Sequence, residues 1–179
     1  LKGQAVQYDN DGYMMHCTPP LNTPGILGDN VTPNIFKSME VNADNSEYTF
    51  TLREGMKWSD GVPVTTDDIR FTWEDLALNE EYSPSGPGSR YRTGSKIRNN
   101  PMTLEIIDDY TFKAKFAKPH GMLALQMAFV WGAPVGLENP KHYMQQFHPK
   151  YADKDELDAM VKEAGLENWT QLWANKIDL

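Results

Sequence analysis

An alternation of apolar and polar positions in the first third of the chain predicts a β-hairpin. Residues 37–41 alternate weakly, whereas Tyr48, Phe50 and Leu52 repeat with a clear period of two, the pattern of a half-buried strand. The run 42–46 between them is rich in Asn and Asp, which favour tight turns. We therefore expect two antiparallel strands that share one buried face.

A second hairpin is expected over residues 104–116. Phe112, Ala114 and Phe116 fall on one face of its second strand, and an acidic pair separates the two strands. The apolar residues 123–129 that follow predict a short buried helix.

Between the hairpins, a turn signal precedes a helix start. Asp60-Gly61 favours a tight turn, and Thr65 with Asp68 three residues later has the spacing of a capping box at a helix N-terminus. The helix should then present an apolar stripe that packs against a sheet. Its members are Ile69, Thr72, Trp73 and Leu76, and we expect Trp58 and Trp73 to fill the core of this unit.

Two segments are poor in regular pattern. Residues 4–34 are dense in proline and glycine, so we expect ordered loop with one short strand near 13–17. Residues 79–101 form a long loop whose centre is basic, with Tyr91 between Arg90 and Arg92. Loops of this length are usually functional or mobile.

The last third of the chain predicts three short helices, over 139–147, 153–164 and 167–175. Residues 153–167 hold six acidic and two basic side chains, which is typical of a solvated surface helix. The predicted fold class is α+β, with mainly antiparallel hairpins packed with helices and a C-terminal helical appendage.

Composition narrows the possible functions. The 179 residues include 25 acidic and 17 basic side chains, a formal net charge of −8, which argues against a nucleic-acid partner. A single cysteine excludes an internal disulfide framework and a zinc module. The best apolar run, residues 122–130, is about half the length of a membrane span.

The two ends of the sequence have no typical terminal features. The chain begins at Leu1 without the basic and apolar segments of a signal peptide, and residues 168–179 stop within amphipathic sequence. We expect part of a larger protein.

Candidate catalytic groups have simpler explanations. Asp67 and Asp68 could act as paired carboxylates in glycosidic chemistry, but neighbours on a helix point about 100° apart, and helix capping explains both. The histidines lack the spacing of a metal pair, and Cys17 beside His16 lacks a third partner. We therefore assign no catalytic or metal-binding residue; the histidines, all expected to be structural or exposed, are His16, His120, His142 and His148.

Aromatic side chains are the better candidates for binding. Trp131 lies in a segment flanked by Gly and Pro, and Tyr91 lies between two arginines. Both offer faces on which a sugar or a peptide can stack. A structural role for Trp131 is equally compatible with the pattern.

Residues 48–76, YTFTLREGMKWSDGVPVTTDDIRFTWEDL, resemble the family 5 extracellular solute-binding proteins of ABC importers. The aromatic strand, the Trp58-Ser59-Asp60-Gly61 turn, and Thr65 with Asp68 stand in that family's order and spacing. Further segments that look like the family extend the resemblance over most of residues 33–150; they are 33–41, 106–112, 116–119 and 140–143.

The resemblance implies a domain organisation. Family members are several times larger and have two lobes that close on ligand, with a smaller domain inserted in the first lobe. By this resemblance, residues 1–32 are a loop-rich lead-in from the first lobe, 33–130 the inserted α+β domain, and 131–179 a helical return segment toward the first lobe. The motif residues are then structural signatures of the inserted domain; they are Trp58, Asp60, Gly61, Thr65 and Asp68.

The resemblance also implies a function. We expect part of a receptor that captures an oligopeptide or oligosaccharide and delivers it to an ABC permease, at the periplasmic or extracellular face of the membrane and without a cofactor. Trp131 and Tyr91 would line its cleft. Two alternatives stay open, namely an interaction module without a small ligand and a carbohydrate hydrolase that uses Asp67, Asp68 or the Asp108-Asp109 pair.

Overall fold

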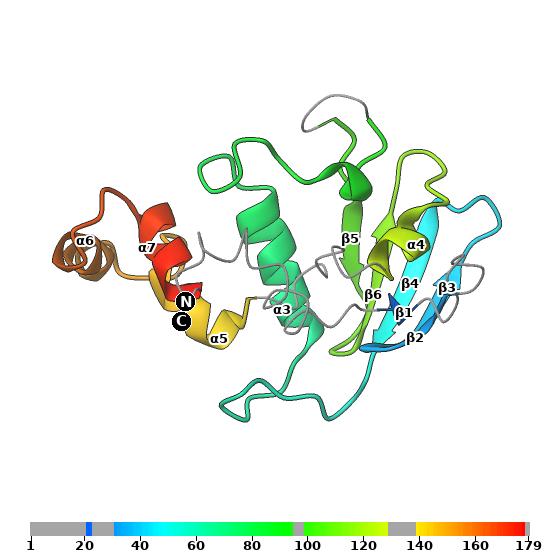
Figure 1. Cartoon of the computed structure of the whole chain (residues 1–179), viewed down its shortest axis with the longest axis horizontal. Helices are drawn as coiled ribbons and strands as arrows, with labels where there is room; N and C mark the ends of the chain where they lie inside the picture. Colours follow the sequence, from blue (N-terminus) through cyan, green and yellow to red (C-terminus); the bar gives the residue numbers. More distant parts are fainter. Residues whose placement is uncertain (1–20, 23–30, 95–98, 129–138, 178–179) are drawn as a thin grey trace. The chain divides into compact units, whose positions relative to one another are not determined.

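Two neighbouring hairpins make the main sheet in the computed structural model, and both are the hairpins expected from the alternation (Figure 1). All four strands are antiparallel, in the order β3-β4-β6-β5. The central pair β4 and β6 places Phe50 opposite Phe112. The strands are β3 (Phe36–Val41), β4 (Glu47–Leu52), β5 (Thr103–Ile106) and β6 (Thr111–Lys115).

The structure describes residues 21–22, 31–94, 99–128 and 139–177. Contacts divide the chain into two compact units: the described residues up to 128 belong to one, and those from 139 onward belong to the other. The strand expected near residues 13–17 lies outside the described residues, and so does Trp131.

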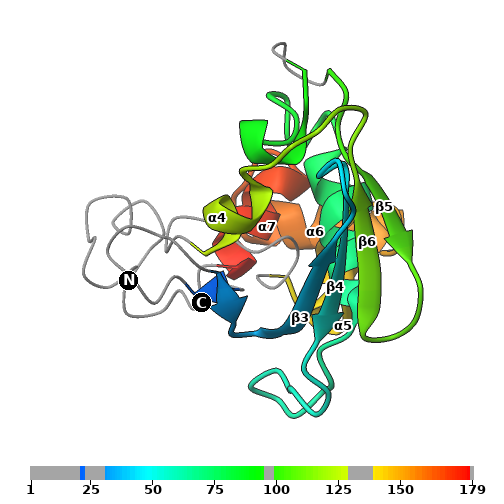
Figure 2. The ribbon, with the colours of Figure 1, turned by 90° about the vertical axis from the view of Figure 1, so that its right-hand side faces the viewer.

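One face of the sheet carries the core of the first unit. The rings of Phe36, Phe50 and Phe112 meet at centroid distances between 5.1 and 5.7 Å, and all three are fully buried. Helix α4 (Leu123–Met127) adds Leu123 and Met127 to the same cluster, and Figure 2 shows it beside the sheet. The predicted buried faces of both hairpins and the short buried helix are confirmed.

The helix after the capping box differs from the expected single stripe. It begins as α3 (Thr66–Arg70) and continues as a π-helix, η1 (Phe71–Ala77), in which the Leu78 amide reaches back five residues to the Trp73 carbonyl at 3.1 Å. Ile69 and Trp73 join the sheet core as expected. Phe71 and Asp75 lie off that stripe but are also buried, because the wider π turn rotates later residues away from a 3.6-residue period.

Trp58 also differs from expectation. Trp73 is 2% exposed and fills the core, but Trp58 is only half-buried and stands outside the core cluster. A further two-stranded sheet, β1 (Leu21–Asn22) with β2 (Thr32–Pro33), lies in the region expected to be loop.

The second unit is helical, as predicted. Helix α6 begins after Asp153, whose carboxylate accepts from the amides of Asp155 and Glu156. None of the helices among the described residues is long and apolar enough to cross a membrane. The elements of this unit are α5 (Lys141–Met144), the 3-10 turn η3 (Gln145–Phe147), α6 (Lys154–Glu163) and α7 (Trp169–Ile177). The α+β class with a C-terminal helical part is therefore confirmed.

Candidate functional site

The turn that precedes α3 is held by its own backbone and by one glycine. The amide of Gly61 donates to the Trp58 carbonyl at 2.9 Å, and the amide of Trp58 donates to the Val62 carbonyl at 2.8 Å. Gly61 has φ of +91°, a conformation that L side chains rarely adopt. The Asp60 carboxylate accepts from the Val62 amide at 3.1 Å. The predicted Asp-Gly turn is confirmed.

The capping box is present at the start of α3. The Thr65 hydroxyl accepts from the Asp67 amide at 3.3 Å, and the Asp68 carboxylate accepts from the Thr65 amide at 3.0 Å. The same carboxylate oxygen also accepts from the Trp58 indole at 3.3 Å. Trp58, Thr65 and Asp68 therefore form one local network that joins the turn to the helix.

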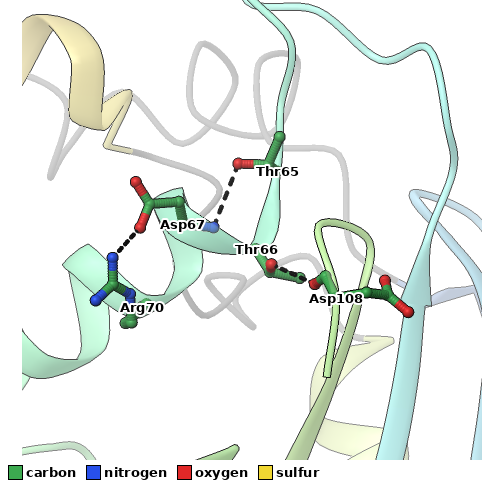
Figure 3. Close-up of polar contacts among 5 residues, drawn as sticks. All are labelled: Thr65, Thr66, Asp67, Arg70 and Asp108. Carbon is green, nitrogen blue, oxygen red and sulfur yellow. Dashed lines mark hydrogen bonds and ion pairs between the residues drawn. The ribbon is translucent and has the colours of Figure 1, made fainter. Parts of the chain in front are cut away.

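A second set of contacts joins the helix start to the β5–β6 turn (Figure 3). The Thr66 hydroxyl donates to the Asp108 carbonyl at 2.7 Å, and the Thr66 amide donates to the Asp109 carbonyl at 2.9 Å. The Asp67 carboxylate pairs with Arg70 one turn along the helix. These bonds fix α3 against the sheet at its N-terminal end.

Three of the four carboxylates considered for hydrolysis, those of Asp67, Asp68 and Asp108, thus have separate partners. Asp67 binds Arg70, Asp68 caps the helix, and the Asp108 carboxylate accepts from the Tyr110 amide at 2.8 Å. Glycosidases need two carboxyl groups that face one substrate. The contacts of Asp67, Asp68 and Asp108 are those of groups that hold local structure.

The long basic loop brings Tyr91 onto the core of the first unit. Tyr91 belongs to a 3-10 turn, η2 (Ser89–Tyr91), and its half-buried ring meets Trp73 edge-on at 5.9 Å. The Arg90 guanidinium stands 5.8 Å from the centre of the Tyr91 ring. A backbone hydrogen bond joins two segments of the loop, since the Thr93 amide donates to the Asn100 carbonyl at 3.1 Å. The ring is therefore partly exposed but anchored.

His120 is the residue near Tyr91 that the sequence pattern did not single out. Its Nε2 lies 2.7 Å from the Arg90 carbonyl oxygen, and its ring packs against Phe116 at 4.7 Å. Residues 90 and 120 are far apart in sequence, so no local signal could have paired them. From the sequence, a structural or an exposed role was expected for His120, and no partner was named for it.

Of the two aromatic residues expected to line a cleft, the structure describes one. Tyr91 contacts the core through Trp73, whereas Trp131 lies outside the described residues. Within the described ranges, no group of three or more His, Cys, Asp and Glu side chains is placed to hold a metal ion.

The helical unit has its own aromatic cluster and a pocket. His148 is 2% exposed and lies edge-on to Trp169 at 4.8 Å, and its Nδ1 accepts from the Lys150 amide at 3.1 Å. A pocket of about 670 Å³ opens on this unit, with mixed amide, aromatic and acidic walls. Its lining residues include Gln145, Gln146, Tyr151, Glu156 and Met160.

Comparison with known proteins gives a family match over most of the chain. The family model described as "Bacterial extracellular solute-binding proteins, family 5 Middle" matches residues 30–169. The chain is 36% identical to the periplasmic alpha-galactoside-binding protein of Rhizobium meliloti over 124 residues, which is 67% of this chain and 16% of that protein. It is 26% identical to the periplasmic oligopeptide-binding protein OppA of Salmonella typhimurium over 166 residues, 79% of this chain and 30% of that protein.

Solved structures give the same result. An oligopeptide-binding protein OppA superposes with a TM-score of 0.75 at 32% identity, over 95% of this chain and 25% of that one. The periplasmic binding protein MelB of Agrobacterium fabrum C58, solved in complex with stachyose, superposes with a TM-score of 0.61 at 26% identity, over 89% of this chain and 22% of that one. The chain therefore spans less than a third of the length of each of these relatives.

Proposed function

The chain belongs to family 5 of the bacterial extracellular solute-binding proteins, and from this we propose that the protein carrying it captures an oligopeptide or an oligosaccharide for an ABC importer. The observation that carries the proposal is the family match over residues 30–169, which includes the turn and capping box between Trp58 and Asp68. Two of the relatives that the chain matches are named for binding oligopeptides and alpha-galactosides.

Within that protein, we assign residues 33–130 to the inserted α+β domain. Residues 1–32 are the lead-in from the first lobe, and 131–179 are the helical return segment toward it. The two lobes close about a hinge when ligand binds. The captured solute is then passed to a membrane permease, from the periplasmic or extracellular side.

Tyr91 and Trp131 are the proposed ligand contacts. An aromatic ring suits the apolar face of a sugar and the side chains of a peptide alike. The half-buried Tyr91 ring, held edge-on against Trp73 at 5.9 Å, supports this role because a fixed ring loses little conformational freedom on binding. The motif residues stay structural in this proposal; they are Trp58, Asp60, Gly61, Thr65 and Asp68.

Binding occurs without covalent chemistry or a cofactor. The separate partners of Asp67 and Asp68 support a receptor rather than a hydrolase. Native mass spectrometry of the intact protein with stachyose and with tetra-alanine tests whether the protein binds one of these compounds and whether it leaves that compound unhydrolysed. We expect a one-to-one complex with one of the two, from which denaturation releases the compound with unchanged mass. Release of a hydrolysed product, or no complex with either, would contradict the proposal.

A further inference from the structure

His120 joins two parts of the first unit that are distant in sequence. Its Nε2 is 2.7 Å from the Arg90 carbonyl oxygen. A carbonyl can only accept a hydrogen bond, so Nε2 must carry the proton and donate it. This places a proton on Nε2 and makes the contact a directed bond from the imidazole to the η2 turn.

The backbone of His120 is held by the β3–β4 hairpin. The His120 amide donates to the Asn45 carbonyl at 2.9 Å, and the Tyr48 hydroxyl donates to the His120 carbonyl at 2.8 Å. Phe116, which follows β6, packs against the ring at 4.7 Å. The His120 backbone and its ring therefore have contacts of their own apart from the loop.

Backbone hydrogen bonds also hold the η2 turn. The Tyr91 amide donates to the Gly88 carbonyl at 2.9 Å, and the Tyr91 carbonyl accepts from the Met102 amide at 2.8 Å. The loop around it is long and rich in glycine and proline, and ordering such a segment costs conformational entropy. A donor that holds the Arg90 carbonyl reduces the number of orientations open to the next residue.

We propose that His120 is a positioning residue: by holding the Arg90 carbonyl, it sets the orientation of the Tyr91 ring for contact with solute. The inference rests on the proposed function in one respect, since it takes Tyr91 as a ligand contact. The structural half of the proposal is that His120 orders the η2 turn, and this half does not depend on any ligand.

The first test needs no ligand and uses three variants of the intact protein. His120→Ala removes the donor. In His120→Gln the amide nitrogen stands about as far from the backbone as Nε2 and can still donate, whereas His120→Asn places its amide nearer the backbone, where Nδ1 stood. Hydrogen exchange should accelerate at the Tyr91 and Met102 amides in the Ala and Asn variants and stay near wild type in the Gln variant.

Exchange at the Phe50 and Phe112 amides of the central strands serves as the internal control. We expect these amides to be unaffected. Unchanged exchange at Tyr91 and Met102 in His120→Ala, or equal acceleration throughout the sheet, would overturn the positioning role.

The second test measures affinity for stachyose and tetra-alanine by calorimetry. His120→Ala should weaken binding of the recognised compound about three- to tenfold, the loss expected for one hydrogen bond, and His120→Gln should restore it. On a Tyr91→Ala background, His120→Ala should have no further effect. An equal loss on both backgrounds would contradict an action through Tyr91. If Tyr91→Ala alone leaves affinity unchanged, the ligand role of Tyr91 fails, while the exchange experiment still decides the structural half.

Discussion

At the scale of single residues, the helix start at Thr65 joins several hydrogen bonds within a short stretch of chain. The Asp68 carboxylate accepts from the Thr65 amide, the Thr65 hydroxyl accepts from the Asp67 amide, and the Trp58 indole is a second donor to the Asp68 carboxylate. The box could be predicted because its spacing is local. The Trp58 contact could not, since it depends on how the preceding turn folds back.

Replacing the cap should therefore have a measurable cost. Thr65→Ala removes the acceptor for the Asp67 amide, and we expect the free energy of unfolding to fall by about 1 kcal/mol. Thr65→Ser keeps the hydroxyl and should stay within a few tenths of wild type. Urea unfolding of the three proteins measures the difference. Equal stability of the Ala and Ser variants would show that the cap contributes nothing.

Tyr48 makes stability depend on pH at the alkaline end. Burial raises the pKa of the Tyr48 hydroxyl above its ordinary value of 10.0, so the folded protein favours the neutral phenol more than the unfolded chain does. The contribution of the neutral Tyr48 phenol to the free energy of unfolding is complete at pH values below the pKa of the unfolded chain. It is lost as the pH rises through the pKa of the folded protein. We expect the free energy of unfolding to fall above about pH 10.

The comparison with Tyr48→Phe isolates this group, because the other tyrosines and the lysines titrate in both proteins. Stability measured by urea unfolding between neutral and alkaline pH should decline less steeply in the variant. The same slope in both proteins would mean that Tyr48 ionises equally in the folded and unfolded states.

At the scale of elements, the features that follow from a local sequence pattern could be predicted. The features that leave no such pattern were missed. Period-two repeats located both hairpins, because each strand buries one face of the same sheet. The π-helix η1 could not be predicted, since one extra residue per turn leaves no compositional mark. The short strands β1 and β2 were also missed, because two-residue strands show no period. The contact between His120 and Arg90 depends on tertiary folding alone.

The turn before α3 offers a test with a matched control. Gly61 has φ of +91° and no neighbour within 4 Å of an added Cβ, so Gly61→Ala strains only the backbone. We expect a loss of about 1 kcal/mol or more. Gly88 also has open space, but its φ is −56°, so Gly88→Ala should be neutral or slightly stabilising. Thermal or urea unfolding that ranks the two variants in the opposite order would contradict the turn geometry.

At the scale of the whole molecule, the chain matches only part of each of its relatives. It spans 16–30% of the length of the relatives compared above, and it contributes an α+β unit and a helical unit, each with its own buried cluster. The ligand was not predictable from this sequence. The structure describes Tyr91 but not Trp131, and the chain is similar both to a relative named for oligopeptides and to one named for alpha-galactosides.

The direct test of the account is calorimetric titration of the intact protein with stachyose and with tetra-alanine. We predict saturable one-site heat with one of the two compounds. Tyr91→Ala should weaken that binding about tenfold, and Tyr91→Phe should leave it nearly unchanged, because the aromatic face makes the contact. No heat with either compound, together with turnover of an aryl glycoside that Asp68→Asn abolishes, would contradict the receptor and favour a hydrolase.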